Sequence, residues 1–313
     1  MISYDFDFPS EAEIMIECTF AHLPGIQRKG EVRLWTTHIK TWSEMIAHSA
    51  THPHFTKKVW ARARSEIIRL QAALDRHDFD FLATEIFEEY HWRLIPNLWG
   101  KILYLDVEMT GLDLEKDEIT TIACYTSQEI RYFIKDVDLP EFVPFLNQFD
   151  AICTFDGEKG DLPFLNKAFG IHITQIHFDL FQISRRLHLH GGLKDLEVRF
   201  NLSREELSGI TGELAIVLWD RYQETHEQKY LDTLVAYNIE DVLHLDSLLQ
   251  IFYNLLKREN HLPARIMDEP ITLPTPPVLP DAGVLQEMIA VLTQRRADEE
   301  EDVVEAYEIE EKK

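Results

Sequence analysis

The spacing of hydrophobic positions changes twice along the chain, and the first stretch has a helical pattern. Apolar residues recur at three- and four-residue steps over Leu34–His48 and again over Lys57–Leu74, which predicts two helices. Pro96 and Gly100 end this pattern. We therefore expect residues 1–100 to form a mostly helical N-terminal region.

The second stretch, residues 101–259, alternates short β-rich runs with helical patterns. The runs that predict strands are Lys101–Val107, Glu118–Tyr125, Glu129–Ile134, Ala151–Phe155 and Ile176–Phe178. The segments that predict helices are Leu162–Phe169, Leu180–His188, Leu193–Phe200 and Lys229–Lys257. Three successive strands followed by alternating strands and helices predict an α/β unit with a mixed five-stranded sheet flanked by helices.

The third stretch is rich first in proline and then in acidic residues. Six prolines between residues 263 and 280 disfavour helix and central strand. We expect residues 260–296 to be a linker with a short helix at Val284–Gln294. Residues 297–313 carry nine acids against two lysines, which predicts a solvated, disordered tail that is available to a protein partner.

The composition is typical of a folded globular protein, since 45% of the 313 residues are hydrophobic. No run approaches the roughly 20 apolar residues of a membrane-spanning helix, so we expect no membrane partner. Three scattered cysteines and an acidic N-terminus without a signal-peptide pattern favour a cytoplasmic location.

The net charge of −24 argues against tight nonspecific binding to nucleic acid, because phosphate contacts usually rest on Lys and Arg. The charge is unevenly distributed, however. Lys57–Arg76 carries six Lys and Arg residues against two acids. The sequence therefore leaves room for a local basic path.

The first candidates for chemistry are Asp106 and Glu108, which follow the apolar part of the first predicted strand. Alternate residues of a strand point to the same face, so the two carboxylates lie side by side. They repel each other and lose hydration unless cations neutralise them. Hard divalent ions prefer such oxygen ligands, so a Mg²⁺ or Mn²⁺ site is expected. The alternative is two solvated acids at a strand end.

Two further candidates follow along the chain. Asp161 opens the helix after the fourth predicted strand, where an acidic N-cap is the simpler interpretation. Tyr237 and Asp241 stand four residues apart and share one face of the long predicted helix. In isolation, an interfacial tyrosine and a solvated acid explain this pair better than a catalytic site does.

The combination is more specific than its parts. The order of D-x-E on a first strand, Asp after a fourth strand and Y-x-x-x-D on a late helix resembles the DEDD exonucleases of the tyrosine subgroup. Residues 101–255 also resemble the YprB-type ribonuclease H-like domain. The matching segments are YLDVEMTGLD, DLPFL, HFDLFQISRRL, GLKDLE and YNIEDVLHL.

This resemblance implies a ribonuclease H-like fold and a metal-dependent 3′–5′ exonuclease that acts on the 3′ ends of single-stranded DNA or RNA. It implies two divalent ions, Mg²⁺ or Mn²⁺, in a two-metal mechanism. The residues that it assigns to the metals are Asp106, Glu108, Asp161 and Asp241. Tyr237 would orient the attacking water.

The second motif departs from the family, because Asp156 and Gly160 replace the usual Asn and Phe. The departure puts rate and substrate in doubt, and it favours one competing interpretation, a catalytically silent nucleic-acid-binding module on the same fold. A ribonuclease H-like or resolvase-like endonuclease is a second alternative. An interaction scaffold that works through the Pro-rich linker and acidic tail is a third.

Four basic residues are candidates for nucleic-acid contacts. Leu23–Glu31 resembles half of a helix-hairpin-helix, in which Arg28 and Lys29 would contact a phosphate. An ordinary turn explains the same segment equally well. Arg185 and Arg186, after the fifth predicted strand, either contact substrate phosphates or lie in solvent.

Overall fold

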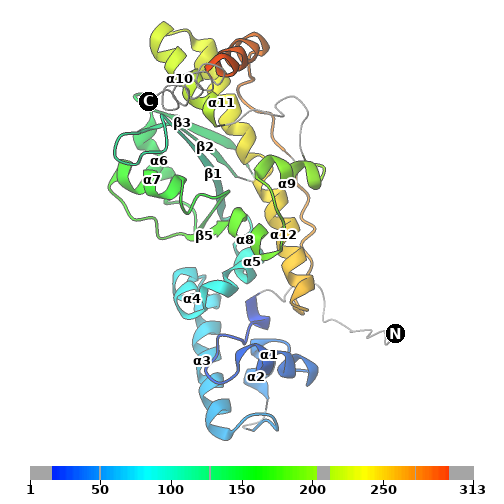
Figure 1. Ribbon diagram of the computed structural model, residues 1–313. Coiled ribbons are helices and arrows are strands. Elements are labelled where there is room, and N and C mark those ends of the chain that lie inside the picture. Colours follow the sequence, from blue (N-terminus) through cyan, green and yellow to red (C-terminus); the bar gives the residue numbers. More distant parts are fainter. Residues whose placement is uncertain (1–15, 49–50, 127, 203–211, 272, 296–313) are drawn as a thin grey trace, which may run out of the picture. The chain divides into compact units, whose positions relative to one another are not determined.

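The computed structural model describes residues 16–48, 51–126, 128–202, 212–271 and 273–295 (Figure 1). The chain folds into two compact units. The first comprises the residues up to Ile102 together with Gln175–Phe178 and Leu249–Pro270. The second comprises Leu103–Thr174, Asp179–Leu248 and the residues from Ile271 onward.

The N-terminal region is helical, as predicted. Its elements are η1 (Ile16–Cys18), α1 (Gln27–Thr36), α2 (Trp42–Ala47), α3 (Lys57–Asp75), α4 (Phe79–Glu85), η2 (Glu88–Leu94) and α5 (Ile95–Leu98). The predicted helix over Lys57–Leu74 is confirmed by α3. The single helix predicted over Leu34–His48 is wrong, because Thr41 and Glu44 form a capping box that starts α2 as a separate helix.

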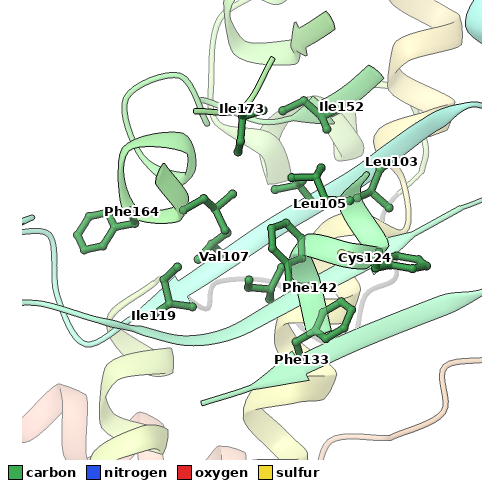
Figure 2. Close-up of a cluster of buried hydrophobic side chains, with 14 residues drawn as sticks. Leu103, Leu105, Val107, Ile119, Cys124, Phe133, Phe142, Ile152, Phe164 and Ile173 are labelled. Carbon is green, nitrogen blue, oxygen red and sulfur yellow. The ribbon is translucent and has the colours of Figure 1, made fainter. Parts of the chain in front are cut away.

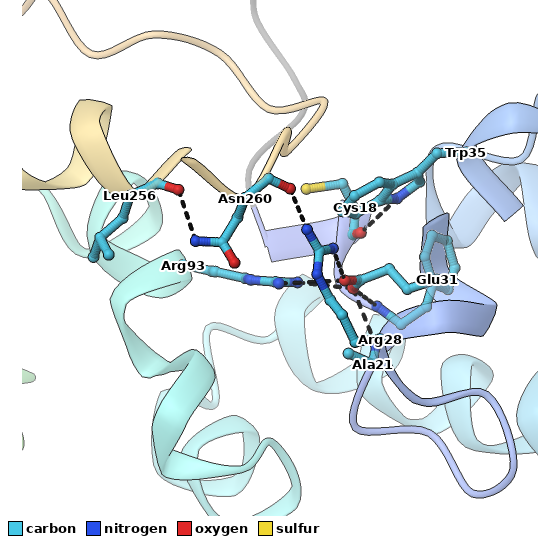
Figure 3. Close-up of polar contacts among 9 residues, drawn as sticks. Cys18, Ala21, Arg28, Glu31, Trp35, Arg93, Leu256 and Asn260 are labelled. Carbon is cyan, nitrogen blue, oxygen red and sulfur yellow. Dashed lines mark hydrogen bonds and ion pairs between the residues drawn. The ribbon is translucent and has the colours of Figure 1, made fainter. Parts of the chain in front are cut away.

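A buried carboxylate organises the first unit (Figure 3). Glu31 Oε1 accepts hydrogen bonds from the backbone amides of Phe20 and Ala21, at 2.7 and 3.0 Å, and from Arg93 Nη1 at 2.8 Å. The side chains of Glu31 and Arg93 are both fully buried. Loss of either partner would leave an uncompensated buried charge, so this pair fixes α1 against η2.

Five strands form one sheet in the order β3-β2-β1-β4-β5 (Figure 1). The strands are β1 (Ile102–Met109), β2 (Ile119–Tyr125), β3 (Ile130–Ile134), β4 (Ala151–Thr154) and β5 (Ile176–Asp179). β2 is antiparallel to both β1 and β3. The predicted α/β class with a mixed five-stranded sheet is confirmed. The predicted strand Lys101–Val107 ended too early: β1 continues to Met109, so Glu108 lies within the strand together with Asp106.

The main core of the second unit covers one face of the sheet (Figure 2). Leu103, Leu105 and Val107 point from β1 into this core and meet phenylalanines such as Phe142 and Phe164. Because side chains alternate along a strand, the intervening Asp106 and Glu108 point to the opposite face. Burial of the apolar face therefore determines where the carboxylates lie.

The remaining helices follow along the chain, and among them α7 and α11 pack against the sheet. They are η3 (Leu139–Glu141), α6 (Phe142–Leu146), α7 (Asp161–Phe169), α8 (Leu180–Arg186), α9 (Leu193–Arg199), α10 (Glu213–Thr225), α11 (Gln228–Val242) and α12 (Leu245–Glu259). A helix over 282–295 follows, as predicted for Val284–Gln294. The acidic tail, 297–313, lies outside the described residues.

One prediction for the late helices was wrong, and one helix was not predicted. Lys229–Lys257 is not one helix, because a turn at Leu243 and His244 separates α11 from α12. The helix α10 was not predicted, although it buries Leu214, Leu218 and Trp219. None of the helices in the described ranges combines the length and the apolarity that spanning a membrane requires.

Candidate active site

β1 and β2 provide the floor of the site. Asp106 lies opposite Ala123 of β2, and Glu108 lies opposite Thr121. Glu108 is only 9% exposed, and Asp106 is partly buried. The two carboxylates therefore project side by side from an inner strand of the sheet, as the alternation predicted.

The helix α11 is fixed against this floor by Asn238, which is fully buried. Its Nδ2 donates to Asp106 Oδ2 at 2.7 Å, and its Oδ1 accepts from Thr121 Oγ1 at 3.0 Å. Asp241 lies three residues further on the same helical face. These two hydrogen bonds therefore aim the last motif at the first.

Asp106, Glu108 and Asp241 converge in space. Each offers a carboxylate oxygen, and these three oxygens all lie within 4.8 Å of one another. Such a group of partly buried acids is stable in its charged form only if cations or hydrogen-bond donors compensate it. The structure thus brings together three residues, of which Asp106 and Asp241 are more than 130 positions apart in the sequence.

Asp161 approaches this group from α7. It is the first residue of the helix, the N-cap position belongs to Gly160, and no side chain caps the helix. Asp161 is 6% exposed, and its Oδ2 is buried with no hydrogen-bond partner. The simpler interpretation of Asp161 as an N-cap is therefore wrong, because its carboxylate makes no capping bond and is left with an unsatisfied acceptor.

The turn that delivers Asp161 is held by Asp179. Asp179 Oδ1 accepts from the backbone amides of Asp156 and Phe181, at 3.0 and 2.9 Å, and Oδ2 accepts from that of Glu158 at 3.1 Å. One buried carboxylate thus joins the start of α8 to the turn before α7. Gly157 also allows the turn to pack closely, since a Cβ there would lie 2.8 Å from Asp161 Oδ2.

Burial raises the pKa of all four carboxyl groups above their ordinary values. The pKa of Asp106 rises to about 7, mainly through burial and then through the charge of Asp241. Burial also raises the pKa of Asp241 to about 6. The pKa values of Glu108 and Asp161 are raised well above the usual range by burial and by the charge of Asp106. The four acids therefore form one electrostatic unit.

Tyr237 lies beside this unit on α11 and is 3% exposed. Burial and the charges of Asp241, Glu108 and Asp106 raise the pKa of its phenol. The phenol therefore keeps its proton at neutral pH and is available as a hydrogen-bond donor.

Two residues of the site, Asn238 and Lys194, were not predicted from the sequence. Asn238 lies between Tyr237 and Asp241 in the motif. A polar amide side chain among the apolar positions of this helix is the feature that could have indicated it. Lys194, the second residue of α9, lies within the segment GLKDLE. Its Nζ is 3.4 Å from Asp241 Oδ1 and 4.6 Å from the centre of the Tyr237 ring.

The four predicted nucleic-acid contacts have different surroundings. Arg28 donates to Glu31 Oε2 and to the carbonyl of Asn260, and it stacks on Trp35 with 4.9 Å to the ring centre. Its guanidinium therefore supports the first unit (Figure 3). Lys29, Arg185 and Arg186 are exposed, and their role in binding nucleic acid stays a prediction.

A groove of about 730 Å³ lies in the first unit, and none of the four candidate carboxylates lines it. It is lined largely by apolar residues of α1, α12 and the segment after α12, including Trp35, Ile251, Leu255 and Ile266. Nothing in the structure identifies its occupant.

The donor set of the acid cluster fits a divalent cation. Its ligand atoms are carboxylate oxygens, which hard ions such as Mg²⁺ and Mn²⁺ prefer. The buried and unpartnered Oδ2 of Asp161 is a further acceptor that a cation would satisfy. No group of His and Cys side chains with metal-binding geometry occurs in the described part of the chain, so a zinc-type site has no support there.

Residues 103–253 match the family model described as the RNase_H superfamily. The match covers the sheet and the helices that carry the acids. Together with the sheet order, it defines this part of the chain as an RNase H-like domain. The YprB-type subgroup is not resolved by this match.

No curated protein matches the chain. Among solved structures, it is similar to Brucella melitensis NrnC with bound Mg²⁺, at 20% identity over 53% of this chain and 78% of that chain, with a TM-score of 0.40. It is similar to Brucella melitensis NrnC bound to pGG at 20% identity, over 54% and 79% of the two chains, with the same TM-score. The assignment of the RNase H-like domain rests on the family match and the sheet order and not on these structures.

Proposed function

We propose that this protein is a metal-dependent 3′–5′ exonuclease of the tyrosine DEDD subgroup, with a YprB-type domain, that hydrolyses single-stranded nucleic acid. The observation that carries the proposal is the convergence of three carboxylates, Asp106, Glu108 and Asp241, on one face of an RNase H-like sheet. These acids come from a strand and a late helix in the order that the motifs require.

The proposal assigns the four carboxylates to two divalent cations, Mg²⁺ or Mn²⁺. When bound, such ions polarise the scissile phosphate and supply hydroxide at neutral pH. Asp106, Glu108 and Asp241 would hold one ion between them. Asp161, with its unsatisfied Oδ2, would support the second.

Tyr237 is assigned a positioning role in the reaction. Its pKa is raised, so the phenol remains protonated. A protonated phenol beside Asp241 can donate a hydrogen bond to the attacking water or to a phosphate oxygen. Removal of the hydroxyl should therefore slow cleavage without removing the metal ligands.

The replaced second-motif residues bear on substrate rather than on the reaction. Asp156 is exposed and has a positive φ of 60°, and its charge raises the pKa of Asp161. An extra negative charge beside the site disfavours an approaching phosphate. We therefore expect Asp156→Asn to lower the KM for single-stranded substrate.

The test uses 5′-labelled single-stranded DNA and RNA with Mn²⁺, with Mg²⁺ and with chelator. A ladder that shortens from the 3′ end and requires metal is expected. Asp106→Asn and Asp241→Asn should lower the rate by at least about 10³-fold, because each removes a charge that holds the ions. Asp232→Asn is the matched control, since Asp232 lies on the same helix as Asp241 but accepts from Gln228.

The alternatives give different results in the same assay. Internal cleavage of a substrate with a blocked 3′ end would indicate the endonuclease. Binding without cleavage in every lane would indicate the silent binding module. Undiminished cleavage by both Asp106→Asn and Asp241→Asn would overturn the assignment of the site.

A further inference from the structure

Lys194 is a cation among acids at the candidate active site. The sequence motifs did not identify it as a site residue. It enters the site from α9, whose first turn is fixed by Asp195 Oδ2 accepting from the Gly192 amide at 2.9 Å. Gly191 has a φ of +111°, a conformation that glycine adopts without strain. The turn before α9 thus aims Lys194 at α11.

The helix α9 is anchored separately by Glu197. Its Oε1 lies 2.9 Å from His244 Nδ1, and both side chains are buried. Lys194 and Glu197 are three residues apart and share one face of the helix. Because Glu197 holds the helix in place, Lys194 is not needed as an anchor, and its ammonium faces the acids.

The charge of Lys194 acts on three of the four acids. It lowers the pKa values of Asp106, Glu108 and Asp241, against the raising effect of burial. One ammonium cannot neutralise three carboxylates, however. When all three are ionised, the site with Lys194 alone carries an excess of negative charge, which favours a cation of higher charge.

We propose that Lys194 is an exchangeable counter-ion of this site: its ammonium compensates Asp241 until a divalent cation replaces it, and so it sets the affinity of the site for metal. The proposal rests on the proposed function, since it needs a metal at these carboxylates. A divalent ion at Asp241 would meet an ammonium now 3.4 Å from Oδ1, and like charges repel.

The Lys194 side chain can move away from Asp241. It is 34% exposed, and its four-carbon stem is flexible, so the ammonium can turn toward water. Metal binding therefore includes the displacement of Lys194, which weakens the observed affinity. Replacing the charged group should remove that competition.

The experiment measures Mn²⁺ binding to the full chain by isothermal titration calorimetry at pH 8.0, where protons compete least for the carboxylates. Lys194→Met should bind Mn²⁺ about tenfold more tightly than the wild type, because one like charge is removed. Lys194→Arg should remain within about twofold of the wild type, since it keeps the charge.

Lys229→Met is the matched control. Lys229 lies at the other end of α11 and pairs with Glu227 at 2.9 Å, so its loss removes the same charge without touching the site. Its affinity for Mn²⁺ should stay within about twofold of the wild type. Lys194→Gln carries the same expectation as Lys194→Met and replaces it if the latter fails to fold.

Thermal melting gives a second readout. In chelator, Lys194→Met should melt at a lower temperature than the wild type, because the acids lose their counter-ion. With saturating Mn²⁺ this difference should disappear. A variant that melts lower in both conditions would show a structural role and overturn the proposal.

The failures of the two proposals are distinguishable. If the wild type binds Mn²⁺ and Lys194→Met binds it no more tightly, only the counter-ion role is overturned. If neither protein binds Mn²⁺, the metal site of the proposed function fails, and the counter-ion role fails with it.

Discussion

At the scale of single residues, the candidate site opposes the stability of the fold. One carboxylate oxygen from each of Asp106, Glu108 and Asp241 lies within 4.8 Å of the other two, and burial raises the pKa of each group. When the pKa of a carboxyl group is higher in the folded chain than in the unfolded chain, the free energy of unfolding decreases as the pH rises from the unfolded to the folded pKa. The metal-free protein therefore holds these charges at a cost in free energy.

Asp106→Asn should increase the free energy of unfolding in chelator at pH 8 by about 1–3 kcal/mol, because it removes one of the repelling charges. The pKa of Asp106 rises from 3.8 to about 7, so the gain should grow between about pH 4 and pH 7 and disappear below pH 4. Urea unfolding across this range measures it. Asp232→Asn should show no such gain, and a loss of stability in Asp106→Asn at pH 8 would contradict the argument.

At the scale of elements, a few polar side chains set how strands and helices meet at the site. Asn238 joins α11 to β1 and β2 through one donated and one accepted hydrogen bond. Asp179 joins β4, α7 and α8 by accepting from amides in the turn and at the helix start. The backbone geometry of the site depends on these two residues, although neither is proposed as a metal ligand.

Asp179→Ala should lower the free energy of unfolding by about 3 kcal/mol, because several backbone amides lose a charged acceptor at once. Asp281→Ala is the comparison, since Asp281 Oδ1 accepts only from Gly283 and Val284 at the start of the helix over 282–295. That cap should be worth about 1 kcal/mol. Denaturant unfolding measures both, and equal losses would contradict the role assigned to Asp179.

At the scale of the whole molecule, the dominant feature is the net charge of −24. Such a charge repels phosphates at long range and weakens association at low ionic strength. Residues 297–313 contribute a net charge of −7, from nine acids and two lysines, and without them the chain carries −17. The terminal segment thus carries 7 of the 24 net negative charges.

Deletion of residues 297–313 should strengthen binding of a single-stranded oligonucleotide several-fold at 50 mM NaCl with Ca²⁺ present, because long-range repulsion falls. The difference should vanish at 0.5 M NaCl, where the charges are screened. Fluorescence anisotropy measures both affinities. Equal affinities at low salt would show that the segment has no electrostatic effect on binding.

The amino-acid sequence determined the local elements and the identity of the acids. Alternation along β1 put Leu105 and Val107 on one face and Asp106 and Glu108 on the other, and this needs only the twofold repeat of a strand. The order of strands and helices likewise predicted the mixed five-stranded sheet. Alternation depends only on neighbouring residues, and the order of strands and helices is read along the chain, so both can be predicted without the fold.

Only the tertiary structure decided which distant residues meet. The break between α11 and α12 has no proline or glycine to signal it, and there His244 turns toward Glu197 of α9. The place of Lys194 beside Asp241, and the unsatisfied Oδ2 of Asp161, likewise depend on how α9 and α7 pack. Packing of whole helices fixes these contacts, because no local pattern specifies a neighbour that lies 40 or more residues away.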